Sequence, residues 1–449
     1  MSGVPTTNLH ITPSNVLSDG KISFASGNPV IQFIIGEQSR GLLGQSLRLC
    51  GEFAVFKDNS SSTIASPKNL LADDNINIDA RLGAYSFIDQ LVIKSQKTHA
   101  VIEHIRHYSR MMASFVPFTA NKEDNLGHQS QAGLSMPNAK VMKESVVEIE
   151  SGNTTKNSFC MHLPCGLFNG TSAIPLDTTG GLLIEIHLAP DSNVLFDETG
   201  SQTTYPNAFY QLSNVFLAAE AEITTPGMGA PGTFEYNSIS SYFTSINSTN
   251  AIINFNLGMS NVLSCFANIL PAFQINNLGF NGCATMPLTN IDGTQANIEQ
   301  VIFTRGGEKF PIEYNIDTIH TGDPHKDQRV LDAQIIREGM SAIRKFANMS
   351  RTMISPTNTH LVDFANPTGA NANTGINIRD DQRADGGNCF IVGVNYDAIS
   401  NQGVSFATQD FGINMRCGLT SNNPHAVFLF IHSKNTLVFD GTGGLQVMS

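Results

Sequence analysis

Apolar and polar residues alternate along much of this chain, and the clearest stretch is Leu182–Leu188. Every second residue of this stretch is Leu or Ile, and the residues between them include Glu185 and His187. Because successive side chains of a strand point to opposite faces, the pattern predicts a half-buried antiparallel strand. Two glycines before it and a proline after it mark its ends.

Similar short apolar runs recur from one end of the sequence to the other. They predict strands at Val30–Ile35, Leu47–Phe56, Phe87–Ile93, Phe209–Ala218, Ile252–Leu257, Val301–Phe303, Phe390–Val394 and Ala426–Ile431. Many short strands with irregular connections between them are typical of β-sandwiches. We therefore expect an all-β fold.

Helical periodicity is found in only two segments. His99–Ser114 and Leu331–Asn348 carry apolar residues three and four positions apart, which places those residues on one face of a helix. We predict a short helix in each segment, lying over the edge of a sandwich.

A Pro- and Gly-rich segment near the middle of the chain predicts a boundary between two units. Residues 224–232 contain two prolines and three glycines, which disfavour both helices and sheet ladders. The 449 residues also exceed the ~250–300 at which a single core stops growing. We predict an N-terminal arm at residues 1–20, a first sandwich at 21–224, a linker at 225–232 and a second sandwich at 233–449. Two unrelated β domains are the alternative, because the halves show no residue-level repeat.

The charge content argues against a nucleic-acid-binding role. Only 14% of the residues are charged, the net charge is -12, and no run of Lys and Arg occurs. Binding to phosphate backbones depends on clustered cations. The few charges also lower the cost of burying surface between subunits, because fewer ions lose their hydration.

The cysteines and the start of the chain indicate a protein made inside a cell. The seven cysteines are scattered, and an odd number cannot pair completely, which favours a reducing compartment. Residues 1–20 are polar and do not have the pattern of a secretory signal. We expect synthesis in a cytosol-like space.

One polar segment is a weak candidate for a metal site. Its candidate ligands are Asp317, His320, Asp323, His325 and Asp327. These residue types bind divalent cations, and the metal-site hypothesis that we consider is a calcium ion bound between subunits. Gly322 and Pro324 equally indicate an exposed loop, which is the interpretation that we favour.

Two further clusters carry no chemistry that we would assign. Cys160, His162 and Cys165 lie close in sequence, but a structural zinc site normally needs four ligands, so we interpret the cysteines as buried thiols. His104 and His107 lack the order of the metalloprotease motif, and we interpret them as the polar face of the first predicted helix. We predict no catalytic residues and no cofactor, and we expect that the protein is not an enzyme.

An ordered series of segments resembles the double jelly-roll major capsid proteins of virophages, polinton-like viruses and their relatives, which are related to adenovirus hexon-type capsids. The segments that carry the resemblance are Ser39–Leu49, Gly83–Ile93, Val101–Tyr108, Cys165–Phe168, Ile174–Leu176, Leu182–Leu188 and Tyr210–Leu217. The resemblance covers most of the first half of the chain and is looser in the second half.

The resemblance implies two jelly-roll sandwiches in tandem, three copies of which form a pseudo-hexameric capsomer of an icosahedral virus shell. Its partners would be other copies of itself, penton proteins and minor capsid or cement proteins, with an internal membrane as a further candidate neighbour. It would reside in the virion. The alternatives are a penton or minor capsid protein, and a non-viral β-sandwich that binds a glycan or another ligand.

Overall fold

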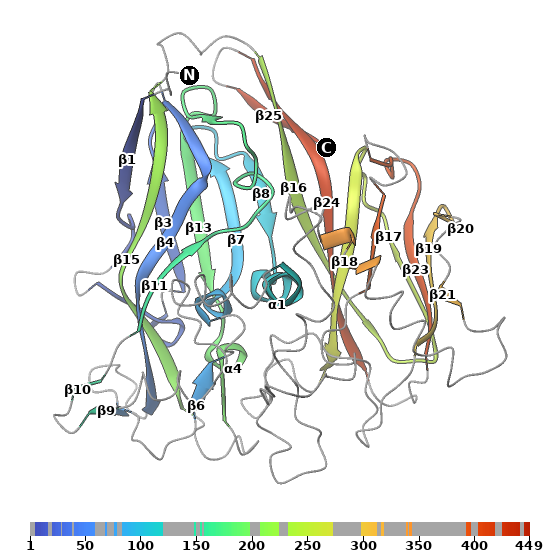
Figure 1. Ribbon diagram of the computed structural model, residues 1–449, viewed down its shortest axis with the longest axis horizontal. Coiled ribbons are helices and arrows are strands. Elements are labelled where there is room, and N and C mark those ends of the chain that lie inside the picture. Colours follow the sequence, from blue (N-terminus) through green and yellow to red (C-terminus); the bar gives the residue numbers. More distant parts are fainter. Residues whose placement is uncertain are drawn as a thin grey trace.

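The strands of the computed structural model form two β-sandwiches that lie side by side (Figure 1). The residues that the structure describes are 5–16, 20–27, 29–37, 40–58, 68–69, 76–78, 83–119, 148–149, 153–154, 157–197, 207–223, 232–272, 298–311, 316–317, 338–339, 341–343, 392–396, 403–417, 424–440 and 444–449. The first sandwich contains the strands up to β15, and the second sandwich contains those from β16 onward.

Two antiparallel layers make the first sandwich, and one of them belongs to a nine-stranded sheet that continues into the second sandwich. One sheet has the order β1 (Thr6–Ile11), β15 (Phe209–Ile223), β4 (Arg40–Asp58) and β11 (Asn157–His162), with β2 (Lys21–Ile22), β5 (Lys68–Asn69) and β12 (Ile174–Pro175) paired beside it. The facing strands are β3 (Val30–Ile35), β13 (Leu182–Leu188), β7 (Ile88–Ser95) and β8 (Val101–Ile105).

The second sandwich is built in the same way. One of its layers consists of β16 (Gly232–Ile246), β24 (His425–Phe439), β18 (Val262–Pro271) and β22 (Val392–Asn395), with β25 (Leu445–Met448) paired to β24. The facing layer consists of β17 (Asn250–Phe255), β23 (Phe411–Cys417), β19 (Ile298–Arg305), β20 (Glu308–Lys309) and β21 (Ile316–Asp317).

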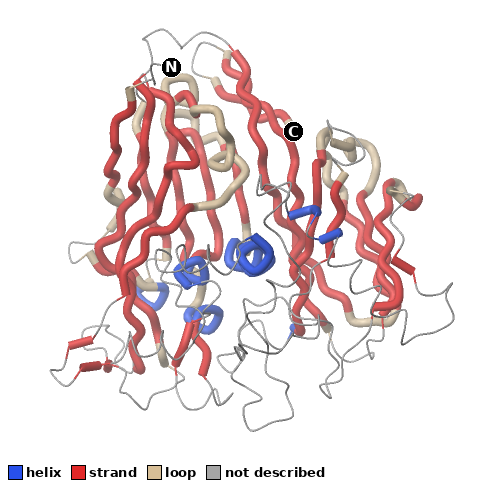
Figure 2. Tube along the Cα trace, viewed as in Figure 1, coloured by secondary structure: helices blue, strands red, loops and turns tan. Residues whose placement is uncertain are grey.

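The remaining elements are short. Small strands are β6 (Ile76–Ile78), β9 (Glu148–Ile149), β10 (Asn153–Thr154) and β14 (Leu195–Asp197), and the helices are α1 (Tyr108–Thr119), α4 (Asp191–Val194), η1 (Phe24–Ser26) and η2 (Gly83–Phe87). In Figure 2, α1 lies between the two sandwiches, and its contacts with β7, β18 and β24 agree with that position. None of the helices in the described ranges has the length and hydropathy needed to cross a bilayer.

The strands predicted from alternation are confirmed. Leu182–Leu188 is β13 with the same two ends, and Val30–Ile35 is β3. The others lie in or overlap β4, β7, β15, β17, β19, β22 and β24. These predictions succeed because at least one face of each strand packs into a core, and both faces of β24 do so.

The helix predicted at His99–Ser114 is wrong in its first half. Val101–Ile105 is strand β8, which pairs antiparallel with β7, and the helix begins only at Tyr108. β-branched residues fit a strand that has a pairing partner, and that tertiary pairing overrides the helical spacing. A positive φ of 55° at His107 separates the two elements.

The second predicted helix and the predicted linker lie mostly outside the described residues. Within Leu331–Asn348, residues 338–339 and 341–343 are helical. Residues 225–231 lie outside the described part, and Gly232 opens β16. Within the segment predicted as an N-terminal arm, Thr6–Ile11 pairs with β15 as strand β1.

Each sandwich has a hydrophobic core, and β24 takes part in both. Val427, Leu429 and Ile431 belong to the core of the second sandwich, whereas Phe428 and Phe430 belong to that of the first. A strand that is buried on both faces has a continuous apolar sequence rather than an alternating one. The outer face of β24 is therefore covered by the first sandwich and by α1.

Candidate functional site

The candidate functional site is the junction between the two sandwiches, where β8 of one meets β16 of the other. The two strands touch in parallel at one pair of residues, His104 and Ser240. The backbone N–H of Arg106 donates to Ser241 Oγ at 2.8 Å, and the Tyr236 hydroxyl donates to the Ile102 carbonyl oxygen at 2.7 Å. These bonds hold the end of β8 against β16.

Glu103 is the charged group at the centre of this junction. Its side chain is 2% exposed. Oε1 accepts the backbone N–H groups of Gly166 at 2.9 Å and Ile239 at 2.7 Å, and Oε2 accepts that of Leu167 at 2.9 Å. One carboxylate thus joins three segments: β8, the loop after β11 and β16.

Burial sets the electrostatics of this carboxylate. Desolvation raises the pKa of Glu103, and the hydrogen bonds from Leu167, Ile239 and Gly166 offset part of that rise. The neighbouring Cys165 thiol is fully buried, which raises its pKa well above the usual value. The arrangement satisfies buried backbone donors, as a structural junction requires.

The loop that carries Gly166 approaches β16 so closely that a side chain would not fit. A Cβ at Gly166 would lie 2.5 Å from the Cα of Ser238 and closer still to the carbonyl oxygen of Asn237. Both obstacles are backbone atoms, so relief would require a strand to move. Glycine is therefore needed for this contact.

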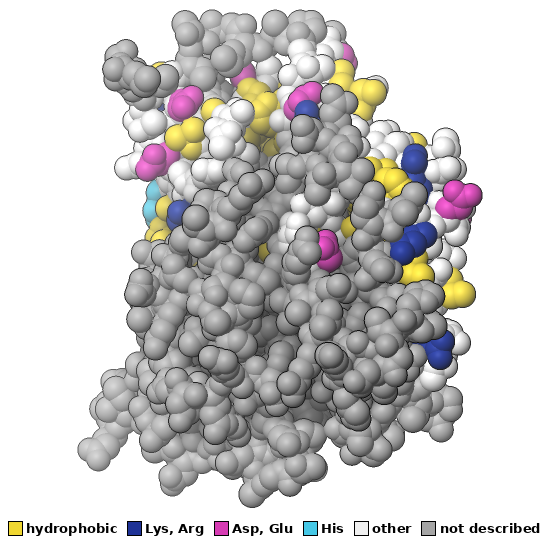
Figure 3. All heavy atoms as spheres, turned by 45° about the vertical axis from the view of Figure 1, so that its right-hand side comes forward, with side chains coloured by type: hydrophobic (Ala, Val, Ile, Leu, Met, Phe, Trp, Pro, Cys, Tyr) yellow, Lys and Arg dark blue, Asp and Glu magenta, His cyan; other side chains and the backbone are white. Residues whose placement is uncertain are grey.

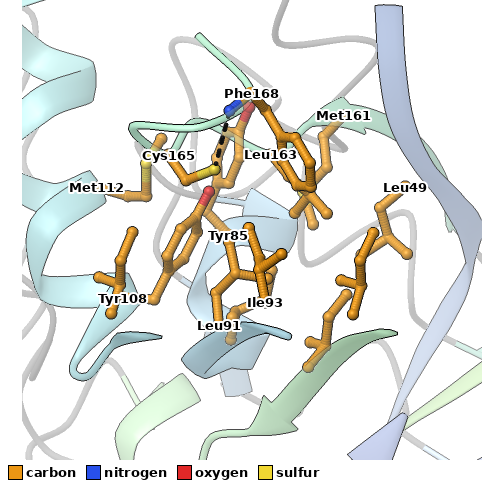
Figure 4. Close-up of a cluster of buried hydrophobic side chains, with 14 of the residues drawn as sticks. Leu49, Tyr85, Leu91, Ile93, Tyr108, Met112, Met161, Leu163, Cys165 and Phe168 are labelled. Atoms are coloured by element: carbon orange, nitrogen blue, oxygen red, sulfur yellow. Dashed lines mark hydrogen bonds between the residues drawn. The ribbon is translucent and has the colours of Figure 1, made fainter. Parts of the chain in front are cut away.

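Aromatic and sulfur-containing side chains fill the space beneath the loop. Figure 4 shows Tyr108 and Met112 of α1 near Cys165, and Phe168 above them. The Tyr108 hydroxyl donates to the Pro164 carbonyl oxygen at 3.0 Å, and the backbone N–H of Phe168 lies 3.3 Å from Cys165 Sγ. Helix α1 is thus fixed to the loop that Glu103 holds.

On its other side, α1 contacts the second sandwich. The Asn268 side-chain amide on β18 donates to the Arg110 carbonyl oxygen at 3.0 Å. The Arg110 guanidinium lies 5.4 Å from the centre of the Phe428 ring, and the His107 ring lies 4.7 Å from it. The junction therefore combines a buried carboxylate, a helix and an aromatic surface of β24.

Comparison with solved structures identifies the architecture. No family model matches the sequence, and no curated protein matches it. Vp54 of PBCV-1, fitted into a reconstruction of the virophage Sputnik, superposes with a TM-score of 0.53 at 8% identity, over 100% of this chain and 98% of that one. The Faustovirus major capsid protein gives 0.53 at 9% identity, with 98% and 91% covered. A chain of the Sputnik virophage gives 0.51 at 12% identity, with 100% and 89% covered.

The chain has the double jelly-roll fold. The first sandwich is its N-terminal jelly roll and the second is its C-terminal jelly roll. Glu103 and Tyr108 belong to the resembling segment Val101–Tyr108, and the helix predicted at His99–Ser114 would have included Glu103. In the double jelly roll, Glu103 lies instead on a strand with its carboxylate buried, because the sheet partner and the Gly166 loop enclose it.

The predicted metal ligands are only partly within the described chain. Asp317 belongs to β21, whereas His320, Asp323, His325 and Asp327 lie outside the described residues. In the described part of the double jelly roll, no three His, Cys, Asp or Glu side chains gather as a metal-binding group. A cation there stays a prediction.

The other clusters are dispersed by the fold. Cys165 is buried in the junction, whereas Cys160 lies opposite Cys50 on the neighbouring strand and is exposed, so its interpretation as a buried thiol is wrong. His104 is on β8, with Nε2 3.0 Å from Gln90 Oε1, and His107 is in the turn before α1. The two histidines do not share a helix face, so that interpretation of them is wrong.

Proposed function

We propose that this protein is a major capsid protein, three copies of which assemble into a pseudo-hexameric capsomer of an icosahedral virus shell. The observation that carries the proposal is a likeness to the Faustovirus major capsid protein that extends over 98% of the chain. That likeness includes both jelly rolls and the junction between them, rather than one sandwich.

The junction supports this role physically. Two sandwiches with a shared buried surface keep a fixed mutual orientation, so that three copies would present six similar sandwiches around one axis. If the two sandwiches of each chain could move relative to each other, the outline of the trimer would vary. A hexagonal lattice position needs a constant outline.

The surface composition also supports extensive contacts between copies. Only 14% of the residues are charged, and large hydrophobic side chains are exposed at Phe24, Ile34, Val101, Ile223, Phe243, Ile252 and Met448. Figure 3 shows hydrophobic side chains beside Lys and Arg on one face of the described surface. Interfaces of obligate assemblies are large and comparatively apolar.

The proposal includes a division of the chain and a set of neighbours. The first jelly roll spans residues 21–224 together with β1 from the N-terminal segment, residues 225–232 link the two, and the second spans 233–449. The protein acts by assembly rather than catalysis, in the virion, next to other capsomers, penton proteins and minor capsid or cement proteins. A net charge of -12 opposes direct contact with a genome.

The test is the mass and outline of the purified full-length protein. Light scattering coupled to size exclusion is expected to give three times the 48.4 kDa of one chain, and negative-stain images are expected to show a pseudo-hexagonal outline. A folded monomer throughout the micromolar range, verified as folded by circular dichroism, would refute the proposal.

A further inference from the structure

Cys50 on β4 and Cys160 on β11 lie directly opposite each other in the first jelly roll. They are register partners in the antiparallel pairing of these strands, and their Sγ atoms are 3.1 Å apart. Directly opposed residues of an antiparallel pair have Cα atoms ~4.5–5.5 Å apart, which lies within the Cα separations of ~4.4–6.8 Å that disulfides span. The two strands therefore hold the sulfurs near the positions that a covalent bond requires.

The two thiols differ in access to solvent. Cys50 is buried, with 7% of its surface exposed, whereas Cys160 is exposed. Burial and the neighbouring Cys160 raise the pKa of Cys50 to about 12, so that Cys50 is protonated at neutral pH. A small reagent therefore reaches Cys160 first.

The other cysteines in the described part of the chain are in different surroundings. Cys165 is buried beside Glu103, Cys265 is buried in the core of the second jelly roll, and Cys417 Sγ lies 3.8 Å from the Ser248 carbonyl oxygen. Among the described cysteines, Cys50 and Cys160 are the pair that are register partners, have Sγ atoms 3.1 Å apart and include one solvent-exposed thiol.

We propose that Cys50 and Cys160 form an intrachain disulfide when the protein meets a low-molecular-weight disulfide such as oxidised glutathione. The Cys160 thiolate attacks one sulfur of the oxidant, which gives a mixed disulfide and releases one glutathione thiolate. Cys50 then loses its proton to solvent and attacks the Cys160 sulfur, which releases the second. Two protein thiols are oxidised to one disulfide, and one glutathione disulfide is reduced to two thiols, which take up the protons.

The bond would secure the end of a sheet. β11 is the last strand in the order β1-β15-β4-β11, so β4 is its neighbour within that order. The two cysteines are 110 positions apart, and a crosslink over a long loop restricts the unfolded chain. Oxidation is therefore expected to stabilise the folded protein, with a rise of about 5 °C in Tm.

The test uses the purified full-length protein, first reduced and then incubated with oxidised glutathione. Thiol titration in denaturant is expected to fall by two from the seven cysteines of the chain. Digestion between Cys160 and Cys165, followed by mass spectrometry, is expected to recover Cys50 linked to Cys160. Adding a reductant is expected to reverse both the thiol loss and the Tm shift.

The matched control is Cys160→Ser, which changes an exposed position and is expected to fold normally. After the same treatment, this variant should keep its thiols and show no rise in Tm. Three outcomes would overturn the proposal: a stable glutathione adduct on Cys160, a link between the Cys160 residues of two chains, or no thiol loss from Cys50.

Discussion

Glu103 on β8 forms hydrogen bonds within the first jelly roll and to β16 of the second. Its two oxygens accept three backbone N–H groups from two segments that lie far from it in sequence. A buried N–H group without an acceptor costs about 1–3 kcal/mol. The carboxylate is therefore a stabilising group whose role depends on its oxygens.

Glu103→Gln is expected to lower the free energy of unfolding by about 1–3 kcal/mol, because one acceptor oxygen becomes an NH2 group that faces N–H donors. Thermal unfolding followed by circular dichroism measures the change. Glu235→Gln is the matched control, since Glu235 is 61% exposed and pairs with Lys434 at the surface. That variant should stay within about 0.5 kcal/mol of the parent protein. Equal losses in the two variants would contradict the assigned role.

Asp191 at the start of α4 provides a prediction about pH. Burial raises the pKa of Asp191 to about 6, although its Oδ1 accepts the backbone N–H of Tyr210 at 3.1 Å. The pKa in the unfolded chain is about 3.9, so folding favours the protonated form. The contribution of Asp191 to the free energy of unfolding is therefore fully present below pH ~4 and is lost as the pH rises through ~6.

Asp191→Asn keeps an acceptor for Tyr210 but cannot ionise. Its Tm is expected to depend less on pH between about 4 and 7, and at pH 7 it should exceed the parent stability by about 1–2 kcal/mol. Thermal unfolding across this pH range measures both effects. Asp410→Asn, at an exposed position, should keep the parent pH dependence. An unchanged pH slope in Asp191→Asn would count against the buried acid.

At the scale of elements, β24 shows how one strand can belong to two cores. Phe428 and Phe430 face the first jelly roll, and the residues between and beside them face the second. The ring of Phe430 lies 5.4 Å from that of Phe266 on β18. The side of β24 that would face solvent in a separate sandwich is here packed as tightly as a core.

Phe430→Ala is accordingly expected to cost about 3–5 kcal/mol, the magnitude of a core truncation, although the side chain points away from its own sandwich. Ile252→Ala on β17, where the side chain is 70% exposed, should cost less than about 1 kcal/mol. Chemical denaturation of both variants measures the difference. Similar small losses in the two would mean that the outer face of β24 is not a packed surface.

The whole molecule is expected to unfold as one unit, because the core of the first jelly roll includes side chains of β16 and β24. Domains that share a core do not unfold independently. The close approach of Gly166 to β16 belongs to the same contact. We therefore expect the junction to make the unfolding of the two jelly rolls cooperative.

Gly166→Ala is expected to separate the unfolding of the two jelly rolls, since the added Cβ meets the backbone of Asn237 and Ser238. Differential scanning calorimetry should show one transition for the parent protein and two for the variant. Gly36→Ala, at a position with open space around the added Cβ, should keep the single transition. Two transitions in the parent protein would show that the junction does not couple the jelly rolls.

Many of the strands and the all-β class could be predicted from the sequence because alternating and short apolar runs are local patterns. Leu182–Leu188 is predicted with both of its ends, since one face packs inward along its whole length. At His99–Ser114 the same method fails, because residues spaced for a helix acquire a strand partner in β7. The spacing of apolar residues within a segment does not show which other strand that segment pairs with in the fold.

The sequence alone determined some of the strands, among them β3 and β13, that the chain has few charges, and that it is long enough for two cores. Only the tertiary structure decided that Glu103 is buried, that β24 is covered on both faces, and that Cys50 meets Cys160. Glu103 contacts segments 63 and 136 positions away, and Cys50 lies 110 positions from Cys160. A local pattern specifies which face of a strand is apolar, but the packing of whole sheets specifies what that face meets.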